Sequence, residues 1–408
     1  MPDEVAAAYH GKRPIYGPGY LIPVPFDPRL ISHVPPAVAK AAMDSGVASR
    51  PIVDMDQYRQ ANGRNIAVAP YQWTRYAGQK PHEKPEIVAG GETGWRRQSR
   101  GTGGYHRAAP RPGVEDKDSQ ARLLDMDREG RDIDLMYPGN WAPPLVTLDP
   151  VLQRALYGAF HRYIQEFCSP DPTRLKSMAL LPCGDIPWSV SELRSLVEEK
   201  WLAGVWLMLP EGMPIDDPDL DPLYDILNEY QLPILDHSFT SEPPFWPGYR
   251  DVWDNPVMVR TASHPWRAAR WLTYLIIGRV FDRFPNLNAA VAEVGHGWLP
   301  HWVTRLDAMI DYVASDTVPT LEHKAADYVK MGRFVCPCEH FEGPEMTKAC
   351  YDLLGEECWS FQSDYPHKEA CFPETAGMII DWPIWQQLGD QALHKHMHAN
   401  AERILRLL

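Results

Sequence analysis

The sequence lacks any apolar run close to the ~20 residues that a membrane-spanning helix needs. Its first residues, MPDEVAAAYHGKRP, carry no apolar core after the basic residues of the kind found in a secretion signal. Basic residues are also scarce, since 40 Lys and Arg face 54 Asp and Glu, for a net charge of -14. Nucleic acids and anionic membranes require a basic footprint. The sequence therefore predicts a cytosolic protein with no nucleic acid or membrane as its main partner.

Cysteines are few and scattered, without the paired spacing of a zinc finger or a disulfide framework. This spacing predicts reduced thiols in a reducing compartment. Aromatic residues are plentiful by contrast: 15 Trp, 18 Tyr and 11 Phe in 408 residues, with 44% hydrophobic content, are enough for a large core. The seven cysteines are Cys168, Cys183, Cys336, Cys338, Cys350, Cys358 and Cys371.

Short apolar runs alternate with amphipathic stretches from Arg50 onward, which is the signature of repeated β/α units. Eight such units predict a (β/α)8 TIM barrel in the α/β class. The amphipathic stretches predict helices, among them Val190–Lys200, Pro222–Tyr230, Trp266–Phe284 and Met346–Leu354. The eight runs predicted as strands are Pro51–Met55, Ile133–Tyr137, Leu175–Leu181, Gly204–Leu209, Leu232–Asp236, Leu287–Ala292, Arg333–Cys336 and Trp359–Gln362.

Two stretches show little apolar periodicity and fall outside the predicted barrel. One is the leader, residues 1–50, whose Pro- and Tyr-rich part is Tyr16–Val34. The other is an insertion after the first strand, residues 61–114, rich in Gly, Arg and aromatics. We expect both to be loops that cap the barrel mouth of a single domain, residues 1–408.

Catalytic groups of a TIM barrel lie just after the strand ends, on the C-terminal face. These positions therefore hold the candidate site residues. They are Asp56 and Tyr58 after the first strand, His237 after the fifth, Glu293 and His296 after the sixth, Glu339 after the seventh and Asp364 after the eighth.

Each candidate has a plainer alternative. His237 ends a buried strand in LPILDHSF, where we expect a metal ligand, although a core histidine bonded to the backbone would also fit. Asp364 is predicted to be a ligand or a base, and the alternative is a helix cap. Glu293 and His296 either bind metal or are solvated loop residues. His264 precedes a helix that we expect Pro265 to begin, so it is either a ligand or an N-cap.

Other histidines receive weaker predictions. His367 in DYPHKE is expected to hydrogen-bond near the site, with Glu339 and His340 as supporting groups behind the ligands. His106 in the insertion is expected on the surface or in a substrate lid. The histidines of QALHKHMH are predicted to lie on a solvated helix face; they are His394, His396 and His398.

From Pro51 to Leu408 the chain resembles the metal-dependent, amidohydrolase-related (amidohydrolase 2) TIM-barrel family that includes aminocarboxymuconate-semialdehyde decarboxylase and aromatic-acid decarboxylases. The pieces that carry the resemblance are IVDMDQY, LPILDH, GRVFDRFPNLNAAVAEVGHGWLPHWVTRLD, SDYPH and NAERILRL. The resemblance places the family's acid-x-His ligand pair on Asp56 and Tyr58. It also places metal ligands on His237 and Asp364, and a catalytic position near Glu293.

Two departures from the family pattern point to different chemistry. Tyr58 stands where the family has a histidine, and His296 adds an imidazole where the family commonly has a small residue. The fourth-strand run GVWLMLP also offers no lysine to bridge two zinc ions. A phenolate beside carboxylates and imidazoles suits ferric iron better than zinc. This set is similar to the non-haem diiron monooxygenases of platensimycin and platencin biosynthesis, an antibiotic pathway. That resemblance implies two iron ions, O2, an external reductant and a diterpenoid carried as a coenzyme A thioester.

The leading hypothesis is therefore an O2-dependent diiron monooxygenase that hydroxylates a bulky acyl-CoA. The sequence does not identify its electron donor, and the protein could form a homo-oligomer. Tyr58, Glu293 and His367 would be catalytic, and Arg96, Arg97 or Arg100 would contact the CoA phosphates. The runner-up is a mononuclear metal-dependent hydrolase or decarboxylase, and the third hypothesis is an inactive barrel kept for binding. The predicted iron ligands are Asp56, Tyr58, His237, His264, Glu293, His296 and Asp364.

Overall fold

The chain divides into two compact units, Met1–Ala77 and Gly78–Leu408. The computed structural model describes residues 37, 39–41, 43, 44, 52, 118–138, 142–237, 256–313, 319–367, 370–405 and 407. In the first unit, Lys40 Nζ pairs with Asp44 Oδ2 at 2.7 Å, one helical turn away. The predicted insertion, most of the leader and the first predicted strand except Ile52 lie outside the described residues. The prediction that they cap the mouth of a single domain therefore stays a prediction.

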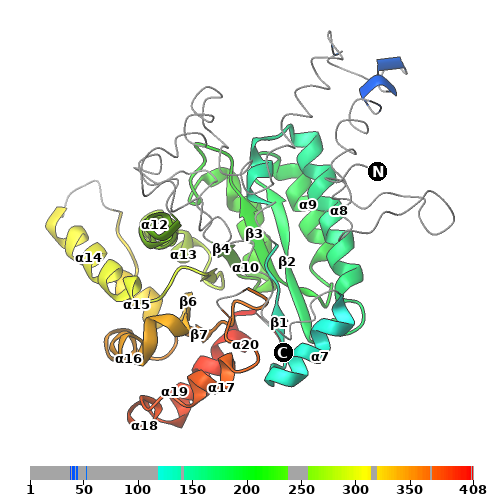
Figure 1. The fold of residues 1–408 in the computed structure, drawn as a ribbon. Coiled ribbons are helices and arrows are strands. Elements are labelled where there is room, and N and C mark those ends of the chain that lie inside the picture. The colour runs from blue at the N-terminus through cyan, green and yellow to red at the C-terminus, as the bar shows by residue number, and fades with distance from the viewer. Residues whose placement is uncertain are drawn as a thin grey trace, which may run out of the picture. The chain divides into compact units, whose positions relative to one another are not determined.

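Seven of the eight predicted runs form strands of one sheet, in which all pairs are parallel and follow chain order from β1 to β7. Helices alternate with the strands, as Figure 1 shows. This sequential parallel arrangement is that of a TIM barrel, so the predicted α/β fold class is confirmed. The strands are β1 (Asp134–Leu135), β2 (Leu175–Pro182), β3 (Leu202–Met208), β4 (Ile234–His237), β5 (Ala289–Ala292), β6 (Phe334–Cys338) and β7 (Trp359–Phe361).

The helices begin where the sequence supplies capping groups. Asp118 accepts a hydrogen bond from Ala121 N, Asp149 from Val151 N and Asp185 from Trp188 N, and these aspartates precede α7, α8 and α9. The helices are α7 (Ser119–Glu129), α8 (Pro150–Cys168), α9 (Ile186–Leu196), α10 (Asp221–Tyr230), α12 (Pro256–Ile277), α13 (Val280–Arg283), α14 (Trp298–Val313), α15 (Ala325–Lys330), α16 (Gly343–Leu354), α17 (Thr375–Ile380), α18 (Trp385–Leu388), α19 (Asp390–His394) and α20 (Asn400–Leu405). Short 3-10 turns are η2 (Pro143–Thr147), η3 (Pro218–Leu220) and η4 (His340–Glu342), and η5 (Lys395–Ala399) is a π-helix.

One helix prediction is wrong at its start. Pro265 was expected to begin the helix after His264, but α12 begins at Pro256 and contains Pro265 in its interior. A proline inside a helix removes one intrahelical hydrogen bond and crowds the carbonyl four residues earlier, at a cost of about 3 kcal/mol or more, which the buried face of a long helix offsets. Trp271, Leu272 and Leu275 provide that buried face.

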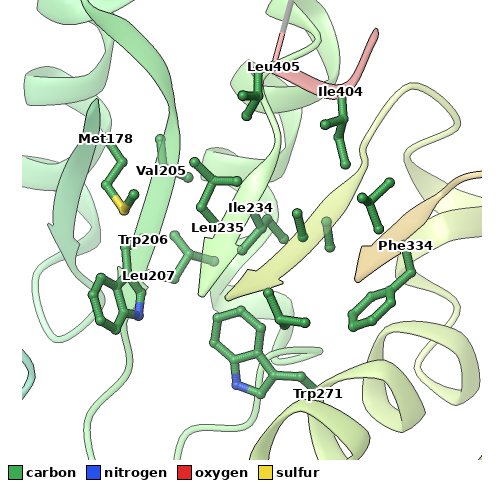
Figure 2. Packing of buried hydrophobic residues seen from close by; sticks show 14 of the residues in the cluster. Met178, Val205, Trp206, Leu207, Ile234, Leu235, Trp271, Phe334, Ile404 and Leu405 are labelled. Atoms are coloured by element: carbon green, nitrogen blue, oxygen red, sulfur yellow. The ribbon is translucent and has the colours of Figure 1, made fainter. Parts of the chain in front are cut away.

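The core lies between the sheet and the surrounding helices. Every residue of β3 is buried, as expected for a parallel strand covered on both faces. Figure 2 shows buried side chains of β2, β3, β4 and β6, Trp271 of α12, and Ile404 and Leu405 of α20, which all belong to one hydrophobic cluster. This packing fixes the strands, and hence the positions of the residues that follow their C-terminal ends.

Gly204 allows β3 and β4 to approach closely. A Cβ atom at this position would lie 2.6 Å from Leu235 Cδ1 and 2.9 Å from Pro233 O. Both distances are shorter than an ordinary van der Waals contact, so the packing of the neighbouring strand requires a glycine at this position.

Six of the seven cysteines are buried and none forms a disulfide; only Cys371 is partly exposed. Burial raises the pKa of Cys168 and of Cys350 to about 12, and raises the pKa values of Cys336, Cys338 and Cys358 well above the ordinary thiol range. These thiols therefore stay protonated in the folded protein. None of the helices in the part of the chain that the structure describes could span a bilayer.

Candidate active site

The ends of two adjacent strands, β4 and β5, bring polar side chains together. His237 is the last residue of β4 and is paired in register with Ala292 of β5, so Glu293 directly follows His237's neighbour. His237 Nε2 lies 2.6 Å from Glu293 Oε2. His237 also lies beside two aromatic rings, with ring centroids 5.7 Å away for Tyr137 and 6.3 Å away for Trp206. The strand register thus explains why this imidazole and this carboxylate meet.

The loop after β7 adds two more groups. His367 Nδ1 lies 2.6 Å from Asp364 Oδ1 and 3.8 Å from Glu293 Oε1. Glu293, Asp364 and His367 each present one ligand atom, and these atoms all lie within 4.8 Å of one another. Among the described residues this is the one cluster of metal-ligating groups found.

The electrostatics of this cluster favour a cation. Without a metal ion, hydrogen bonds to Asp364 and then to Glu293 raise the pKa of His367 to about 10, so the ring carries a positive charge between the two carboxylates. A metal ion that bound here would take the place of this proton, because a histidine binds metal as the neutral ring. Two carboxylates this close repel each other unless a positive charge lies beside them. Carboxylate oxygens and an imidazole nitrogen also form a donor set that suits Mn²⁺ or Zn²⁺. The residues present therefore fit a divalent metal ion.

Both carboxylates sit on left-handed backbone, with φ 56° at Glu293 and φ 56° at Asp364. This conformation costs a residue other than glycine about 1–2 kcal/mol. Such strain is found at functional sites, where neighbouring groups hold it in place. At Glu293, the backbone N donates to Gln362 Oε1 at 3.1 Å and the backbone O lies 2.8 Å from His264 Nδ1.

His264 therefore contacts the backbone of Glu293. The carbonyl can only accept, so Nδ1 carries a proton. A metal-bound histidine commonly makes such a bond through its other nitrogen. The prediction that His264 binds metal stays a prediction.

His296 lies deeper in the fold and is fully buried. Its Nε2 lies 2.9 Å from Thr347 Oγ1, and its Nδ1 accepts from Glu339 N at 3.3 Å and lies 3.1 Å from Glu342 Oε2. Burial lowers the pKa of this imidazole. Both ring nitrogens therefore contact protein groups, and His296 is not part of the Glu293–Asp364–His367 cluster.

Two supporting groups follow β6. Glu339 is buried and accepts a hydrogen bond from Gln362 Nε2 at 2.9 Å. His340 Nε2 lies 3.5 Å from Cys371 Sγ. Gln362 was not predicted as a site residue, because an uncharged amide gives no chemical signal in the sequence. Its place at the end of the predicted run Trp359–Gln362 was the one available signal.

The loop that carries Asp364 and His367 is anchored by Tyr365. The Tyr365 hydroxyl donates to Asp125 Oδ2 at 2.7 Å, and both residues are buried. The guanidinium groups of Arg122 and Arg131 lie 4.9 Å and 4.5 Å from the centre of the tyrosine ring, within the range of a cation–π interaction. Residues of α7 and of the segment after it thus hold the loop after β7.

Behind His237, a buried ion pair stabilises β4 against α12. Arg267 Nε lies 3.2 Å from Asp236 Oδ2, and Asp236 is fully buried. Burial raises the pKa of Asp236, while the Arg267 guanidinium opposes that shift.

The remaining predicted residues lie elsewhere. Asp56, Tyr58, Arg96, Arg97, Arg100 and His106 lie outside the described residues, so Asp56 and Tyr58 remain predicted ligands only. The prediction of a solvated face for the C-terminal histidines is wrong for His396, which is fully buried with Nδ1 3.0 Å from the Tyr351 hydroxyl. The π-helical turn that contains His396 breaks the regular helical spacing on which that prediction depended.

Comparisons with known proteins identify the family of this chain. The amidohydrolase family model matches residues 142–407, which include every described site residue except Tyr137 and residues of α7 and β1. The chain belongs to the amidohydrolase family. One relative of this chain is 2-amino-3-carboxymuconate-6-semialdehyde decarboxylase of Dictyostelium discoideum. The two sequences are 24% identical over 261 residues, which cover 61% of this chain and 67% of the relative.

A different similarity is short. The NADP-dependent malic enzyme of Rhizobium meliloti (strain 1021) is 67% identical over 60 residues, which are 15% of this chain and 8% of that enzyme. The amidohydrolase chain thus spans less than a tenth of the malic enzyme's length.

Three solved structures share the fold of this amidohydrolase. The 5-carboxyvanillate decarboxylase LigW of Sphingomonas paucimobilis has 22% identity and a TM-score of 0.59, covering 73% of this chain and 87% of that one. The Novosphingobium aromaticivorans 5-carboxyvanillate decarboxylase, complexed with manganese, has 19% identity and a TM-score of 0.59, covering 92% and 93%. The 2,6-dihydroxybenzoate decarboxylase of Rhizobium has 18% identity and a TM-score of 0.57, covering 72% and 88%.

These findings correct the leading hypothesis. The prediction of an O2-dependent diiron monooxygenase is wrong, and so are its two irons, its external reductant and its CoA-linked diterpenoid substrate, because the similar proteins are decarboxylases and one of them is complexed with manganese. The error came from assigning iron chemistry to Tyr58, a single position outside the described residues. The contact of Arg96 and Arg97 with CoA phosphates loses its basis with that substrate.

Proposed function

We propose that this amidohydrolase is a metal-dependent decarboxylase that removes a carboxylate from an aromatic or conjugated acid. The observation that carries the proposal is the cluster of Glu293, Asp364 and His367 at the C-terminal ends of the strands, with His237 beside it. The names of the similar proteins support the reaction class, since they act on 5-carboxyvanillate, 2,6-dihydroxybenzoate and a carboxymuconate semialdehyde.

Glu293, Asp364 and His367 would hold one divalent metal ion, with manganese as the first candidate because one similar structure is complexed with it. Such an ion, when bound, supplies positive charge that orients the substrate oxygens and stabilises negative charge that develops during the reaction. The chain's own contribution is to place the donors. Glu293 Oε1 faces His367, whereas Oε2 faces His237, so one carboxylate serves two neighbours.

Decarboxylation breaks a carbon–carbon bond, CO2 leaves, and the electron pair left on carbon takes a proton. The pair formed by His237 Nε2 and Glu293 Oε2, 2.6 Å apart, shares a proton at the strand ends. We propose that the His237–Glu293 pair transfers this proton to the substrate carbon, since a general acid must lie within hydrogen-bond reach of the reacting group. Burial raises the pKa of the adjacent Tyr137, which therefore stays a neutral phenol that can donate to a substrate oxygen.

The proposal is tested by loading the full chain with Mn²⁺ and measuring CO2 release from 5-carboxyvanillate and from 2,6-dihydroxybenzoate. We expect CO2 release without O2 uptake, and we expect Asp364→Asn to abolish both Mn²⁺ binding and CO2 release. Asp381→Asn is the matched control, because Asp381 is an exposed aspartate at the end of α17. Full Mn²⁺ binding by Asp364→Asn would overturn the metal site. Ester hydrolysis without CO2 release would instead assign the chain to a hydrolase.

A further inference from the structure

Gln362 joins three neighbouring strand ends through one side chain. It directly follows β7, and its pairing neighbour Glu339 directly follows β6, because Cys338 and Phe361 are in register. Gln362 Nε2 donates to Glu339 Oε1 at 2.9 Å. Gln362 Oε1 accepts from the backbone N of Glu293, which follows β5, at 3.1 Å.

The two partners fix how the amide is oriented. A backbone N–H can only donate and an ionised carboxylate can only accept, so the oxygen must face Glu293 and the nitrogen must face Glu339. Glutamate at this position would keep the acceptor and lose the donor. Methionine would keep most of the shape and lose both. The site therefore uses both ends of a neutral amide.

Glu293 has a specific need for such a partner. Its backbone is left-handed, a conformation that costs about 1–2 kcal/mol and that relaxes when nothing holds it. Gln362 contacts its N–H, and His264 contacts its carbonyl, so the backbone of Glu293 is held on both sides. A relaxed backbone would turn the Cα–Cβ bond and carry the carboxylate away from its present neighbours.

We propose that Gln362 is a positioning residue for Glu293. Its amide holds the left-handed backbone in the conformation that directs the Glu293 carboxylate at both His237 and the Asp364–His367 pair. Gln362 acts through Glu293 and does not itself contact the reacting atoms. The inference rests on the proposed decarboxylase function for its kinetic effect, whereas its effect on metal binding depends only on the geometry of the cluster.

The first experiment compares Gln362→Met and Gln362→Glu with the wild-type chain. Loss of a hydrogen bond that orients a ligand costs about 10- to 100-fold in metal affinity or activity. We therefore expect both variants to bind Mn²⁺ at least about tenfold more weakly, as measured by the EPR signal of free Mn²⁺. Gln362→Met has no acceptor for the Glu293 N–H, whereas in Gln362→Glu repulsion between the new carboxylate and the Glu339 carboxylate turns the acceptor away from Glu293. We also expect kcat for CO2 release to fall more than KM changes, because substrate contacts remain. Circular dichroism verifies that each variant is folded.

A matched control exists in the same chain. Gln391 Nε2 donates to Glu356 Oε1 at 3.1 Å on the exposed side of the C-terminal segment, so Gln391→Glu makes the same chemical change far from the strand ends in sequence. This variant should bind Mn²⁺ as the wild type does. An equal loss in Gln391→Glu would show a general charge effect and would overturn the proposal.

A rescue experiment separates positioning from loss of fold. In the double variant Gln362→Glu with Glu339→Gln, residue 339 becomes the donor and residue 362 keeps the acceptor for the Glu293 N–H. We expect this exchange to recover most of the Mn²⁺ affinity lost in Gln362→Glu. Wild-type affinity and kcat in folded Gln362→Met would overturn the proposal. If the wild type releases no CO2, the proposed function fails, and the Mn²⁺ measurements still decide the role of Gln362.

Discussion

The anchoring of the loop after β7 by Tyr365 gives a prediction for the variant Tyr365→Phe. This change keeps the aromatic ring between Arg122 and Arg131 and removes only the hydroxyl that donates to Asp125. A hydrogen bond to a charged acceptor contributes about 1.5–3 kcal/mol to stability. We expect the free energy of unfolding to fall by that amount. For a unit of this size the thermal midpoint should fall by about 2–4 °C.

The assay is thermal and urea unfolding of the variant, with Tyr163→Phe as the control, because Tyr163 is an exposed tyrosine on α8. Since Tyr365 is covalently joined to Asp364, loosening of the loop should also weaken Mn²⁺ binding. Wild-type stability in Tyr365→Phe would show that the hydrogen bond from Tyr365 to Asp125 contributes nothing to the free energy of unfolding. Lower stability with unchanged Mn²⁺ affinity would show that the anchor stabilises the fold without positioning Asp364.

Three further predictions follow from buried or charged contacts. Arg267→Met takes the guanidinium from buried Asp236 and should lower the free energy of unfolding in urea by about 3–5 kcal/mol; an unchanged urea midpoint would contradict this. Gly204→Ala places a methyl group against Leu235 and should cost about 1–3 kcal/mol, measured as a lower thermal midpoint, and unchanged stability would refute the close approach. In the metal-free protein the pKa of His367 is raised to about 10 from an unfolded value of about 6.5, so its stabilising effect is complete below pH 6.5 and is lost as the pH rises through 10. Because the ring is 59% exposed, the loss should be about 1 kcal/mol at most, seen as a smaller difference between wild type and His367→Gln at high pH, and a constant difference would contradict it.

Much of the fold could be predicted because strand burial leaves a direct trace in the sequence. The runs that became β2 to β7 are short, apolar and separated by helical spacing, and all of them appear as strands. Helix starts were harder to predict. Proline favours the first turn of a helix, so Pro265 predicts a helix start. In the structure α12 instead continues through Pro265.

The site residues also fall into those that the sequence predicted and those that it did not. His237, Glu293 and Asp364 were found because parallel strands end at a common edge, so a position after a strand implies proximity to the others. Gln362 was not found, since its partner Glu293 lies 69 residues away along the chain and an amide has no titration or ligand chemistry to mark it. The reaction was misassigned because the nature of the metal was inferred from a single phenol, Tyr58.

Because six of the seven cysteines are buried, the reactivity of each thiol reports local unfolding of the segment around it. An alkylating reagent reacts with thiolates, and only the partly exposed Cys371 is open to such a reagent in the folded state. Each further thiol becomes modified only when the segment around it opens. Mass spectrometry after timed alkylation should therefore report opening of β6, through Cys336 and Cys338, separately from opening of α8, through Cys168.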